Sequence, residues 1–482
     1  MLIQCLTTDT TMTLWWEKPE TAPENYAVYI DGAHVGNADK THYTVDNLSP
    51  DTDYTVEVAG IGSIAAHTRK PLHRIDVTRE PYNAVGDGVT LNTSALQRAI
   101  DDCGADDCVY LPKGIYMSGA LYLHSHMTLY VDECAVLQGT QNIADYEPRI
   151  LSRFEGTECM CYASLINMGK LDHTSAPNCE DVLICGGGTI AGGGYTLARN
   201  MIEHERKLLE KQIAALGDKI NEYECMDTIP GRVRGRLINM SNCRNVRITN
   251  LLLADGASWN VHMIYSDNIT TDHCTIRSRG IWNGDGWDPD SSENCTIFAC
   301  RFETGDDSIS IKSGKNPEGN IINRPTKHIR IFDCKCVCGN GITMGSEMSG
   351  GVDDVRVWDC DMGSAYYGIE IKGTKKRGGY VRNVHMRDCT VARVLLHAVG
   401  YNDDGIGAPV PPKFSDCTFD HVRMLGKSID HKGEMQTVPI IEAVGFDVPG
   451  YEVENVKFID CTNESGADIV LKKCKHISIN ID

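Results

Sequence analysis

Three aspartates in the segment NGDGWDPDSSENCTIFACRFETGDDSISIKSG, residues 283–314, form the part of the sequence best suited to acid–base chemistry. Asp285 lies in one glycine turn, and Asp306 and Asp307 lie in a second glycine turn 21 and 22 residues later. Carboxyl groups that gather in one place repel one another, so one keeps its proton while another stays ionised. Such a set provides the acid and the base that cleavage of a glycosidic bond requires. The alternative is that these acids only cap turns.

The strands that hold these aspartates repeat along the chain. Asn, Asp or His precedes alternating β-branched residues in NVRI at 245, NITT at 268, NCTI at 294, HIRI at 328, DVRV at 354, NVHM at 383, NVKF at 455 and HISI at 476. A cysteine follows most of these motifs, mostly at intervals of 26–34 residues. A period of this size is typical of stacked coils, and its composition predicts an all-β solenoid, a β-helix.

The cysteines that mark the repeat are predicted to form a ladder inside the solenoid. They are Cys243, Cys274, Cys300, Cys334, Cys360, Cys389, Cys417 and Cys461. Cys334, Cys336 and Cys338 alternate along one strand, which leaves a metal site as the competing interpretation. Cysteines with a period of two on one face are more typical of small core residues than of paired zinc knuckles, so the core is favoured.

The solenoid determines the distance between the aspartates. Equivalent positions in neighbouring coils would lie ~4.8 Å apart, so Asp285 is expected beside Asp306 and Asp307. Asn340 and Lys372 follow at further intervals of 33 and 32 residues and continue the same column. Four coils span ~14 Å, the length of two or three sugar rings, which favours a groove for an oligosaccharide.

The chain divides near residue 70. Residues 1–70 contain short alternating segments between turn signals, which predict a small antiparallel sandwich. Residues 75–482 contain one short amphipathic helix and then the repeated strands. A segment at about 196–224 has apolar residues at helical spacing and is predicted to be an inserted helix. Because its apolar stripe would pack on the solenoid or on a second copy, a homo-oligomer is left open.

Composition limits the partners and the compartment. The chain has 66 acidic residues against 46 Lys and Arg, a formal net charge of -20, which argues against nucleic acid or an anionic membrane as partner. No stretch reaches the ~18 apolar residues of a membrane span. The amino terminus lacks a signal-peptide pattern, and 21 cysteines spread over a long chain indicate reduced thiols, so a cytoplasmic location is expected.

Four ordered blocks resemble the signature blocks of the polygalacturonase family of glycoside hydrolases, family 28. They are NGDGWDPDSSEN, TGDDSISIKSG, GNGITMGSEMSGGV and GIEIKGTKKRGGYV, and GSEMSGGV is especially similar to bacterial exo-acting members. The resemblance covers about residues 75–475 and implies a right-handed parallel β-helix. Residues 1–70 resemble a fibronectin type III domain, which also precedes the helix in bacterial exo-polygalacturonases. The expected substrate is a pectin-derived, galacturonate-containing oligosaccharide.

The resemblance also assigns roles to the aspartates. Asp306 would be the general acid, while Asp285 and Asp307 would hold the water that attacks with inversion. This chemistry needs no metal or organic cofactor, and the aspartates lack the ligand pattern of a calcium cluster.

Three further residues are candidates for contact with the substrate. His262, in SWNVHMIYSDN, resembles a family histidine that reaches a subsite, and a core histidine is the alternative. Trp287 flanks Asp285 and would stack on a sugar face. Lys312 follows the double aspartate on the same strand and would contact the substrate or be solvated.

Two positions depart from the family pattern. The family's Gly-His-Gly is Gly-Asn-Gly here, so Asn340 keeps a hydrogen bond but not a charge. The family's Arg-Ile-Lys is Glu-Ile-Lys, and strand alternation places Glu370 beside Lys372 on the groove face. A uronate carboxylate beside Glu370 would be repelled, so plain oligogalacturonate is expected to be a poor substrate.

Two other functions are compatible with the same features. A pectate lyase-type enzyme would use the same fold and would require calcium. A non-catalytic glycan-binding protein would keep the groove and lose turnover, because a solenoid can bind glycans along its face.

Overall fold

The computed structural model describes residues 2–429 and 433–482, which divide into two compact units. The first unit contains the residues up to Ile75 together with Gly104–Cys108. The second contains Asp76–Cys103 and Val109–Asp482.

The first unit is an antiparallel sandwich of a three-stranded sheet, in the order β1-β2-β5, and a four-stranded sheet, in the order β4-β3-β6-β7. Alternating residues of these strands face inward and are buried, and Trp16 packs edge-on against Tyr26 with 5.1 Å between ring centroids. The strands are β1 Gln4–Thr7, β2 Met12–Trp15, β3 Tyr26–Ile30, β4 Ala33–Ala38, β5 His42–Val45, β6 Asp53–Val58 and β7 Gly62–His67.

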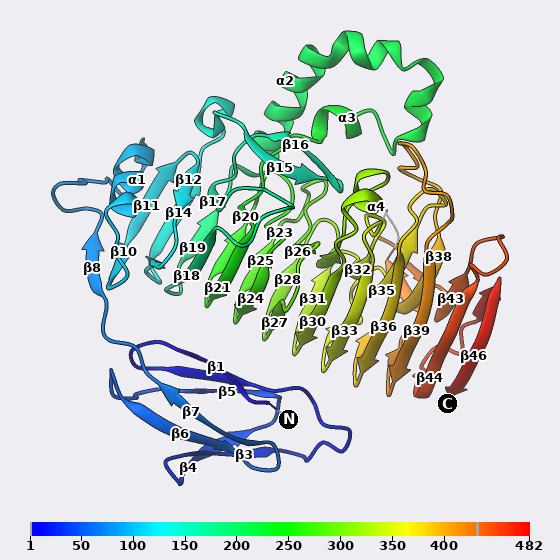
Figure 1. The fold of residues 1–482 in the computed structure, drawn as a ribbon, viewed down its shortest axis with the longest axis horizontal. Coiled ribbons are helices and arrows are strands. Elements are labelled where there is room, and N and C mark those ends of the chain that lie inside the picture. The colour runs from blue at the N-terminus through cyan, green and yellow to red at the C-terminus, as the bar shows by residue number, and fades with distance from the viewer. Residues whose placement is uncertain (1, 430–432) are drawn as a thin grey trace. The chain divides into compact units, whose positions relative to one another are not determined.

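The second unit is a parallel β-helix, as the repeat predicted (Figure 1). Each regular coil contributes one strand to an 11-stranded parallel sheet, which bears the predicted groove. The strands of this sheet are β12 Leu121–Leu123, β17 Ile166–Met168, β20 Ile238–Ser241, β23 Val261–Ile264, β26 Trp287–Asp290, β29 Ile309–Ile311, β32 Gly341–Met344, β35 Gly368–Gly373, β38 Arg393–Ala398, β43 Ile441–Val444 and β45 Ile469–Lys472.

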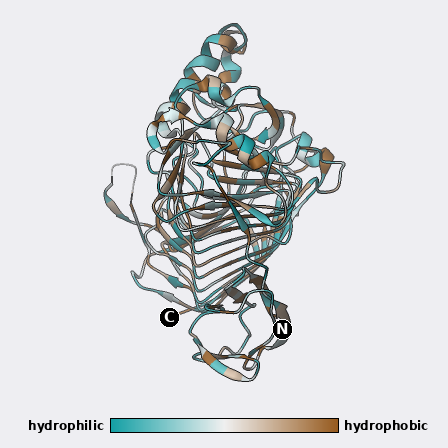
Figure 2. Ribbon diagram, turned by 90° about the vertical axis from the view of Figure 1, so that its left-hand side faces the viewer, coloured by the Kyte–Doolittle hydropathy of each residue, from teal (hydrophilic) through white to brown (hydrophobic). Residues whose placement is uncertain are grey.

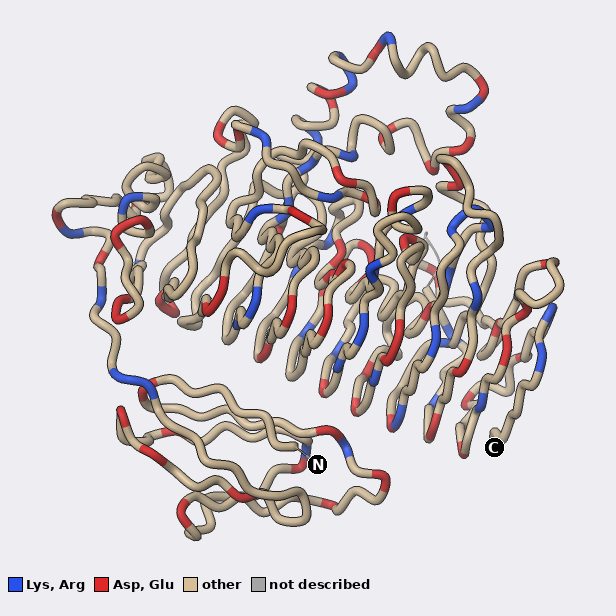
Figure 3. The backbone as a smooth tube through the Cα atoms, in the orientation of Figure 1, with Lys and Arg blue, Asp and Glu red and all other residues tan. Residues whose placement is uncertain are grey.

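Two further strands of each coil join a 24-stranded sheet. Buried and more exposed residues alternate along strands such as β33 and β36. Hydrophobic and hydrophilic segments both occur along the coils (Figure 2), and charged residues of both signs lie along the stacked strands (Figure 3). From β11 onward the strands are β11 Gly114–Ser118, β13 Met127–Val131, β14 Ala135–Gly139, β18 Cys179–Cys185, β19 Thr189–Ala191, β21 Cys243–Thr249, β22 Leu252–Ala254, β24 Asp267–Asp272, β25 Thr275–Arg277, β27 Thr296–Phe298, β28 Arg301–Glu303, β30 Thr326–Phe332, β31 Lys335–Cys338, β33 Val352–Trp358, β34 Asp361–Met362, β36 Tyr380–Arg387, β37 Thr390–Val391, β39 Lys413–Asp420, β40 Arg423–Met424, β44 Val453–Asn463 and β46 Cys474–Ile481.

The predicted cysteine ladder is present, with two exceptions. Six of its eight members stack in one buried row, namely Cys274, Cys300, Cys334, Cys360, Cys389 and Cys461. Val422 takes the cysteine's place in the coil between those of Cys389 and Cys461. The prediction was wrong for Cys243, which lies opposite Cys179, and for Cys417, which lies opposite Val384.

Helices interrupt the coils at few places. In the long inserted helix α2, Leu197, Met201 and Ile202 are buried against the solenoid, whereas Leu209 and Ile213 of the predicted stripe are only half-buried. No helix within the described ranges has the length and apolar composition of a membrane span. The helices are α1 Thr93–Asp101, η1 Ile143–Tyr146, α2 Gly194–Ala215, η2 Gly217–Glu222, α3 Thr228–Gly231 and α4 Glu318–Ile322.

Candidate active site

The three aspartates lie together at the start of two neighbouring strands of the 11-stranded sheet. β26 and β29 pair in parallel at Trp287 and Ile309, so Asp285 and Asp307 precede the paired residues by the same two positions. The Gly286 amide, directly after Asp285, donates a hydrogen bond of 2.9 Å to the Asp307 carbonyl. The predicted spacing of one coil between the aspartates is therefore present.

Gly305 allows the turn before Asp306 to approach the preceding coil. A Cβ atom added at Gly305 would lie 2.6 Å from the carbonyl oxygens of both Ile281 and Ser278. Any larger residue would push the turn outward and move the two aspartates that follow it. Steric contact with the preceding coil therefore explains why a glycine precedes Asp306 and Asp307.

Hydrogen-bond donors surround the Asp307 carboxylate. Asn340 Nδ2 donates to Asp307 Oδ1 over 3.0 Å, and Thr343 Oγ1 donates to the same oxygen over 2.7 Å. Ser310 Oγ donates to Asp307 Oδ2 over 3.1 Å. Asn340 Nδ2 also lies 3.0 Å from Asp306 Oδ1, so this asparagine links the two acids as an uncharged donor.

Asp306 has the protonation behaviour of a general acid. Burial and the adjacent Asp307 charge raise the pKa of Asp306 to about 7, although Lys372 and Lys312 act in the opposite direction. A carboxyl group with this pKa carries its proton up to neutral pH and can donate it there. Burial also raises the pKa of Asp285 well above its usual value, although the Lys312 charge acts in the opposite direction. Asp306 is assigned as the acid because it pairs this protonation behaviour with the family role that the sequence resemblance gives it.

Lys312 is a positioning residue for Asp285. Its Nζ lies 3.0 Å from Asp285 Oδ2, 2.8 Å from Ser310 Oγ and 3.7 Å from Glu347 Oε2. Only 3% of Lys312 is exposed, so it reaches the aspartate rather than open solvent. Although burial by itself lowers the pKa of Lys312, Asp285 and Asp288 hold it well above its usual value. The sequence predicted that Lys312 contacts the substrate. Its position instead indicates that it binds and positions the Asp285 carboxylate.

Two predicted substrate contacts lie in the interior. Trp287 faces into the coil between Val261 and Ile309 and donates its indole N–H to Thr271 Oγ1 over 3.0 Å. It is 0% exposed and cannot stack on a sugar, because strand alternation turns it away from the groove. His262 does face the groove side but is also 0% exposed. The prediction of sugar contacts was wrong for both residues.

The groove face contains an acid that sequence reasoning missed. Asp288 lies opposite His262 in the strand register, and neither of its carboxyl oxygens has a hydrogen-bond partner within the described residues. Burial and the Asp285 charge raise the pKa of Asp288 well above its usual value. Because side chains alternate along a strand, Asp288 faces outward where Trp287 faces inward. This period of two could have identified Asp288 from the sequence.

Glu370 and Lys372 form the pair that the sequence predicted. Lys372 Nζ lies 3.0 Å from Glu370 Oε2, and His397 Nε2, from the next coil, lies 2.7 Å from Glu370 Oε1. Burial alone would raise the pKa of Glu370, but Lys372 and His397 lower it to about 2. Glu370 is therefore ionised, and the Lys372 charge beside it is largely neutralised.

A hairpin closes the groove on the amino-terminal side of the aspartates. Its strands, β15 Ile150–Phe154 and β16 Thr157–Cys161, pack on the groove face of the preceding coils (Figure 1). Ser152 Oγ donates to Asn239 Oδ1 of β20 over 2.9 Å, and Arg153 Nη1 donates to Asp290 Oδ1 of β26 over 2.9 Å. Phe154 stacks on Trp259 with 4.6 Å between ring centroids. This cover explains why His262 is inaccessible.

The inserted helix braces this hairpin and brings another acid toward the site. Tyr162, just after the hairpin, donates to Glu205 Oε1 of α2 over 2.9 Å. Beyond α2, the Glu224 amide donates to Asn402 Oδ1 over 2.9 Å. After burial and Asp307, the Glu224 charge also contributes to the raised pKa of Asp306. No spacing in the sequence connects Glu224 with the aspartates, because it lies in the insertion.

Comparison with protein families yields two matches. The family described as glycosyl hydrolases family 28 matches residues 154–404, and the fibronectin type III domain matches residues 3–73. The family 28 match lies within the 75–475 range of the resemblance, and the fibronectin type III match overlaps most of residues 1–70.

Individual proteins are similar over most of the chain. A Vitis vinifera protein named "Probable polygalacturonase" is 34% identical over 328 residues, which cover 64% of this chain and 59% of that protein, less than two thirds of its length. The exo-poly-alpha-D-galacturonosidase of Dickeya chrysanthemi is 25% identical over 436 residues, covering 82% and 72%. The solved family 28 exopolygalacturonase of Yersinia enterocolitica has the same fold, with a TM-score of 0.82, 22% identity, and coverage of 100% of this chain and 98% of that one.

Proposed function

Because the chain belongs to glycosyl hydrolases family 28, we propose that it hydrolyses pectin-derived, galacturonate-containing oligosaccharides with inversion, from one end of the chain. The observation that supports this proposal is that three clustered aspartates have different environments and can take different roles. Asp306, whose pKa is raised to about 7 by burial and Asp307, is protonated, while Asp307 accepts three hydrogen bonds. Asp306 can therefore donate a proton, while the hydrogen-bonded Asp307 can accept one.

The proposed reaction assigns one step to each group. Asp306 donates its proton to the glycosidic oxygen of the leaving sugar. Asp285 and Asp307 orient a water molecule and accept its proton as the water attacks from the opposite face of the ring. Burial raises the pKa of Asp285, and the Lys312 charge, whose Nζ lies 3.0 Å from that carboxylate, opposes this shift and favours the ionised form that this role requires.

The closed amino-terminal side of the groove supports exo action. The β15–β16 hairpin covers the groove-facing Asn239 and His262, which are 1% and 0% exposed, so a sugar chain cannot continue past the aspartates in that direction. We therefore place only the terminal sugar between the hairpin and the acids. The rest of the oligosaccharide, which contains the leaving group, extends toward β35 and β38. The Dickeya relative is likewise named as an exo-acting enzyme.

We further propose that the altered pair shifts the specificity of the first leaving sugar. The ionised Glu370 lies beside Lys372, at the place where a second positive charge would attract a uronate carboxylate. The first leaving sugar is therefore neutral, or it is a uronate whose carboxylate is held away from Glu370. Plain oligogalacturonate is then a poor substrate.

Changing Glu370 to arginine tests this specificity. Glu370→Arg is expected to raise kcat/KM for digalacturonate by roughly tenfold, because it replaces a repelled contact with a charge-assisted one. Steady-state release of reducing ends measures the effect, and Glu370→Gln serves as the control that removes the charge alone. Efficient cleavage of digalacturonate by the wild type, weakened by Glu370→Arg, would contradict the specificity but not the mechanism.

The function itself is tested by product analysis. The wild type should release single sugars or short fragments from one end of defined pectic oligosaccharides, without intermediate lengths appearing first. An even spread of product lengths would argue for internal cleavage. An unsaturated product that absorbs in the ultraviolet and requires calcium would identify a lyase instead.

A further inference from the structure

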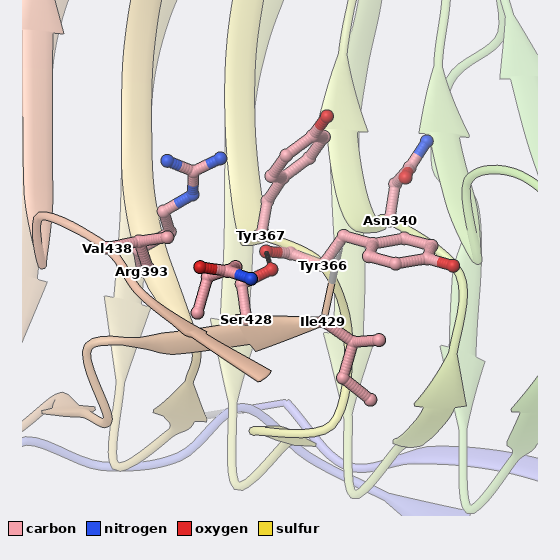
Figure 4. Close-up of a pocket in the computed structure, with 8 residues that line it drawn as sticks. Asn340, Tyr366, Tyr367, Arg393, Ser428, Ile429 and Val438 are labelled. Carbon is pink, nitrogen blue, oxygen red and sulfur yellow. Dashed lines mark hydrogen bonds between the residues drawn. The ribbon is translucent and has the colours of Figure 1, made fainter. Parts of the chain in front are cut away.

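A cavity of about 440 Å³ lies in the groove on the open side of the aspartates. It is covered from one side by a hairpin of strands β41 Lys427–Ile429 and β42 Met435–Thr437. Figure 4 shows the residues that line it, with the Arg393 guanidinium and the Tyr367 ring directed to the same side. The lining residues are Asn340, Tyr366, Tyr367, Arg393, Ser428, Ile429, Gln436 and Val438.

Arg393 is the charged group of this cavity. Its guanidinium carbon lies 5.0 Å from the centroid of the Tyr367 ring, and its nearest acidic partner, Glu442, is 4.0 Å from Nη1. The buried Nε has no hydrogen-bond partner among the described residues. A guanidinium group offers a rigid, two-pronged donor that matches a carboxylate, and here its donors are not consumed by a close ion pair.

The strand register shows which coil bears Arg393 and where along its strand it lies. Gly341, Gly368 and Arg393 are paired in three successive coils, so Arg393 lies one coil beyond the strand that bears Glu370 and Lys372. One coil corresponds to ~4.8 Å, about the length of one sugar ring. The residue of β38 in register with Lys372 is His397, four positions along the strand from Arg393. A second leaving sugar beside Arg393 thus lies one coil beyond Lys372 and toward the start of the strands.

We propose that this cavity binds the carboxylate of a uronate at the second leaving position, with Arg393 as its ligand. The Tyr366 ring, which is 36% exposed, provides an aromatic face for the sugar. Ser428, whose hydroxyl donates to the Tyr366 carbonyl over 2.7 Å, and Gln436 add polar side chains to the lining. This inference rests on the proposed function, in which Glu370 excludes a uronate carboxylate from the first leaving position. Together the two positions select an oligosaccharide in which a neutral sugar precedes an acidic one.

Binding to an inactive protein tests the inference without turnover. The ligands are the trisaccharide galacturonate–rhamnose–galacturonate and the same trisaccharide methyl-esterified at its reducing-end carboxyl group. In the Asp306→Asn background, calorimetry should give a Kd for the free acid that is roughly 10–100-fold lower than for the ester. Adding Arg393→Gln should abolish this preference by weakening the free acid alone. Equal binding of acid and ester before that change would overturn the inference.

Kinetics on the active enzyme separate this inference from the proposed function. Arg393→Gln should lower kcat/KM for the free acid by roughly 10–100-fold, mainly through KM, and leave the ester within about twofold. The matched control is Arg382→Gln, which removes an exposed arginine paired with Asp353 on the outer sheet and should change neither value. An equal loss of kcat/KM on the free acid and the ester would show that Arg393 has only a structural role. Acid-selective binding without any turnover would instead contradict the proposed function and support the carboxylate site.

Discussion

Asp306→Asn is expected to lower kcat on a natural oligosaccharide by roughly 10²–10⁴-fold, because it removes the proton donor at nearly constant volume. The loss should depend on the leaving group. An aryl galacturonide with a strongly acidic phenol leaves without protonation, so its hydrolysis should fall by less than about tenfold. A comparable loss on both substrates would mean that Asp306 positions the substrate rather than protonating the leaving oxygen.

The pH dependence provides an independent readout of the same residue. Burial and Asp307 raise the pKa of Asp306 from 3.8 to about 7, so the wild-type rate should fall as pH rises through about 7 and the acid loses its proton. The folded protein also retains a proton that the unfolded chain releases between these two values. The stability that this proton contributes is complete below about pH 3.8 and is lost as pH rises toward 7. Asp306→Asn should therefore be at least as stable as the wild type at pH 8, which urea unfolding measures.

Lys312→Met is expected to have the second largest effect, on stability as well as on rate. Lys312 and Asp285 are 3% exposed each and lie 3.0 Å apart, so the substitution leaves Asp285 buried without its closest counter-charge. Breaking such a buried pair costs about 3–5 kcal/mol in the free energy of unfolding. Asp285 then takes up a proton and ceases to act as a base, so kcat falls as well.

A surface pair of equal length serves as the control for Lys312. Lys335 Nζ lies 3.0 Å from Asp361 Oδ2, but about half of each side chain is exposed. Lys335→Met should change the free energy of unfolding by no more than about 1 kcal/mol and leave the rate unchanged. Lys312→Met could instead change the free energy of unfolding and the rate as little as Lys335→Met. That result would show that Lys312 does not control the ionisation of Asp285.

The sequence was sufficient for the features that a local period determines. The repeat predicted the parallel coils, the one-coil interval predicted the proximity of Asp285 and Asp307, and strand alternation predicted the pairing of Glu370 with Lys372. Strand alternation also applies to β26. Used there as it was for β35, it would have predicted that Trp287 faces inward.

Features that depend on distant segments could not be read in this way. The groove face at His262 is covered by a hairpin that begins at Ile150, and no repeat or spacing links the two. Glu224 affects Asp306 through its charge and lies in an insertion whose helical period predicts only how the helix packs. Arg393 is in register with Gly341 and Gly368 rather than with Lys372, and its role depends on a cavity that strands β41 and β42 cover.

The anomeric configuration of the first product tests the central claim most directly. If Asp306 acts as the acid while Asp285 and Asp307 direct water to the opposite face of the ring, fresh product should have the configuration opposite to that of the substrate. Proton NMR during the first minutes of hydrolysis, before mutarotation mixes the anomers, measures this. Inverted product is the result that the three-aspartate mechanism predicts, and retained configuration would contradict it by requiring a covalent intermediate on one of these carboxylates.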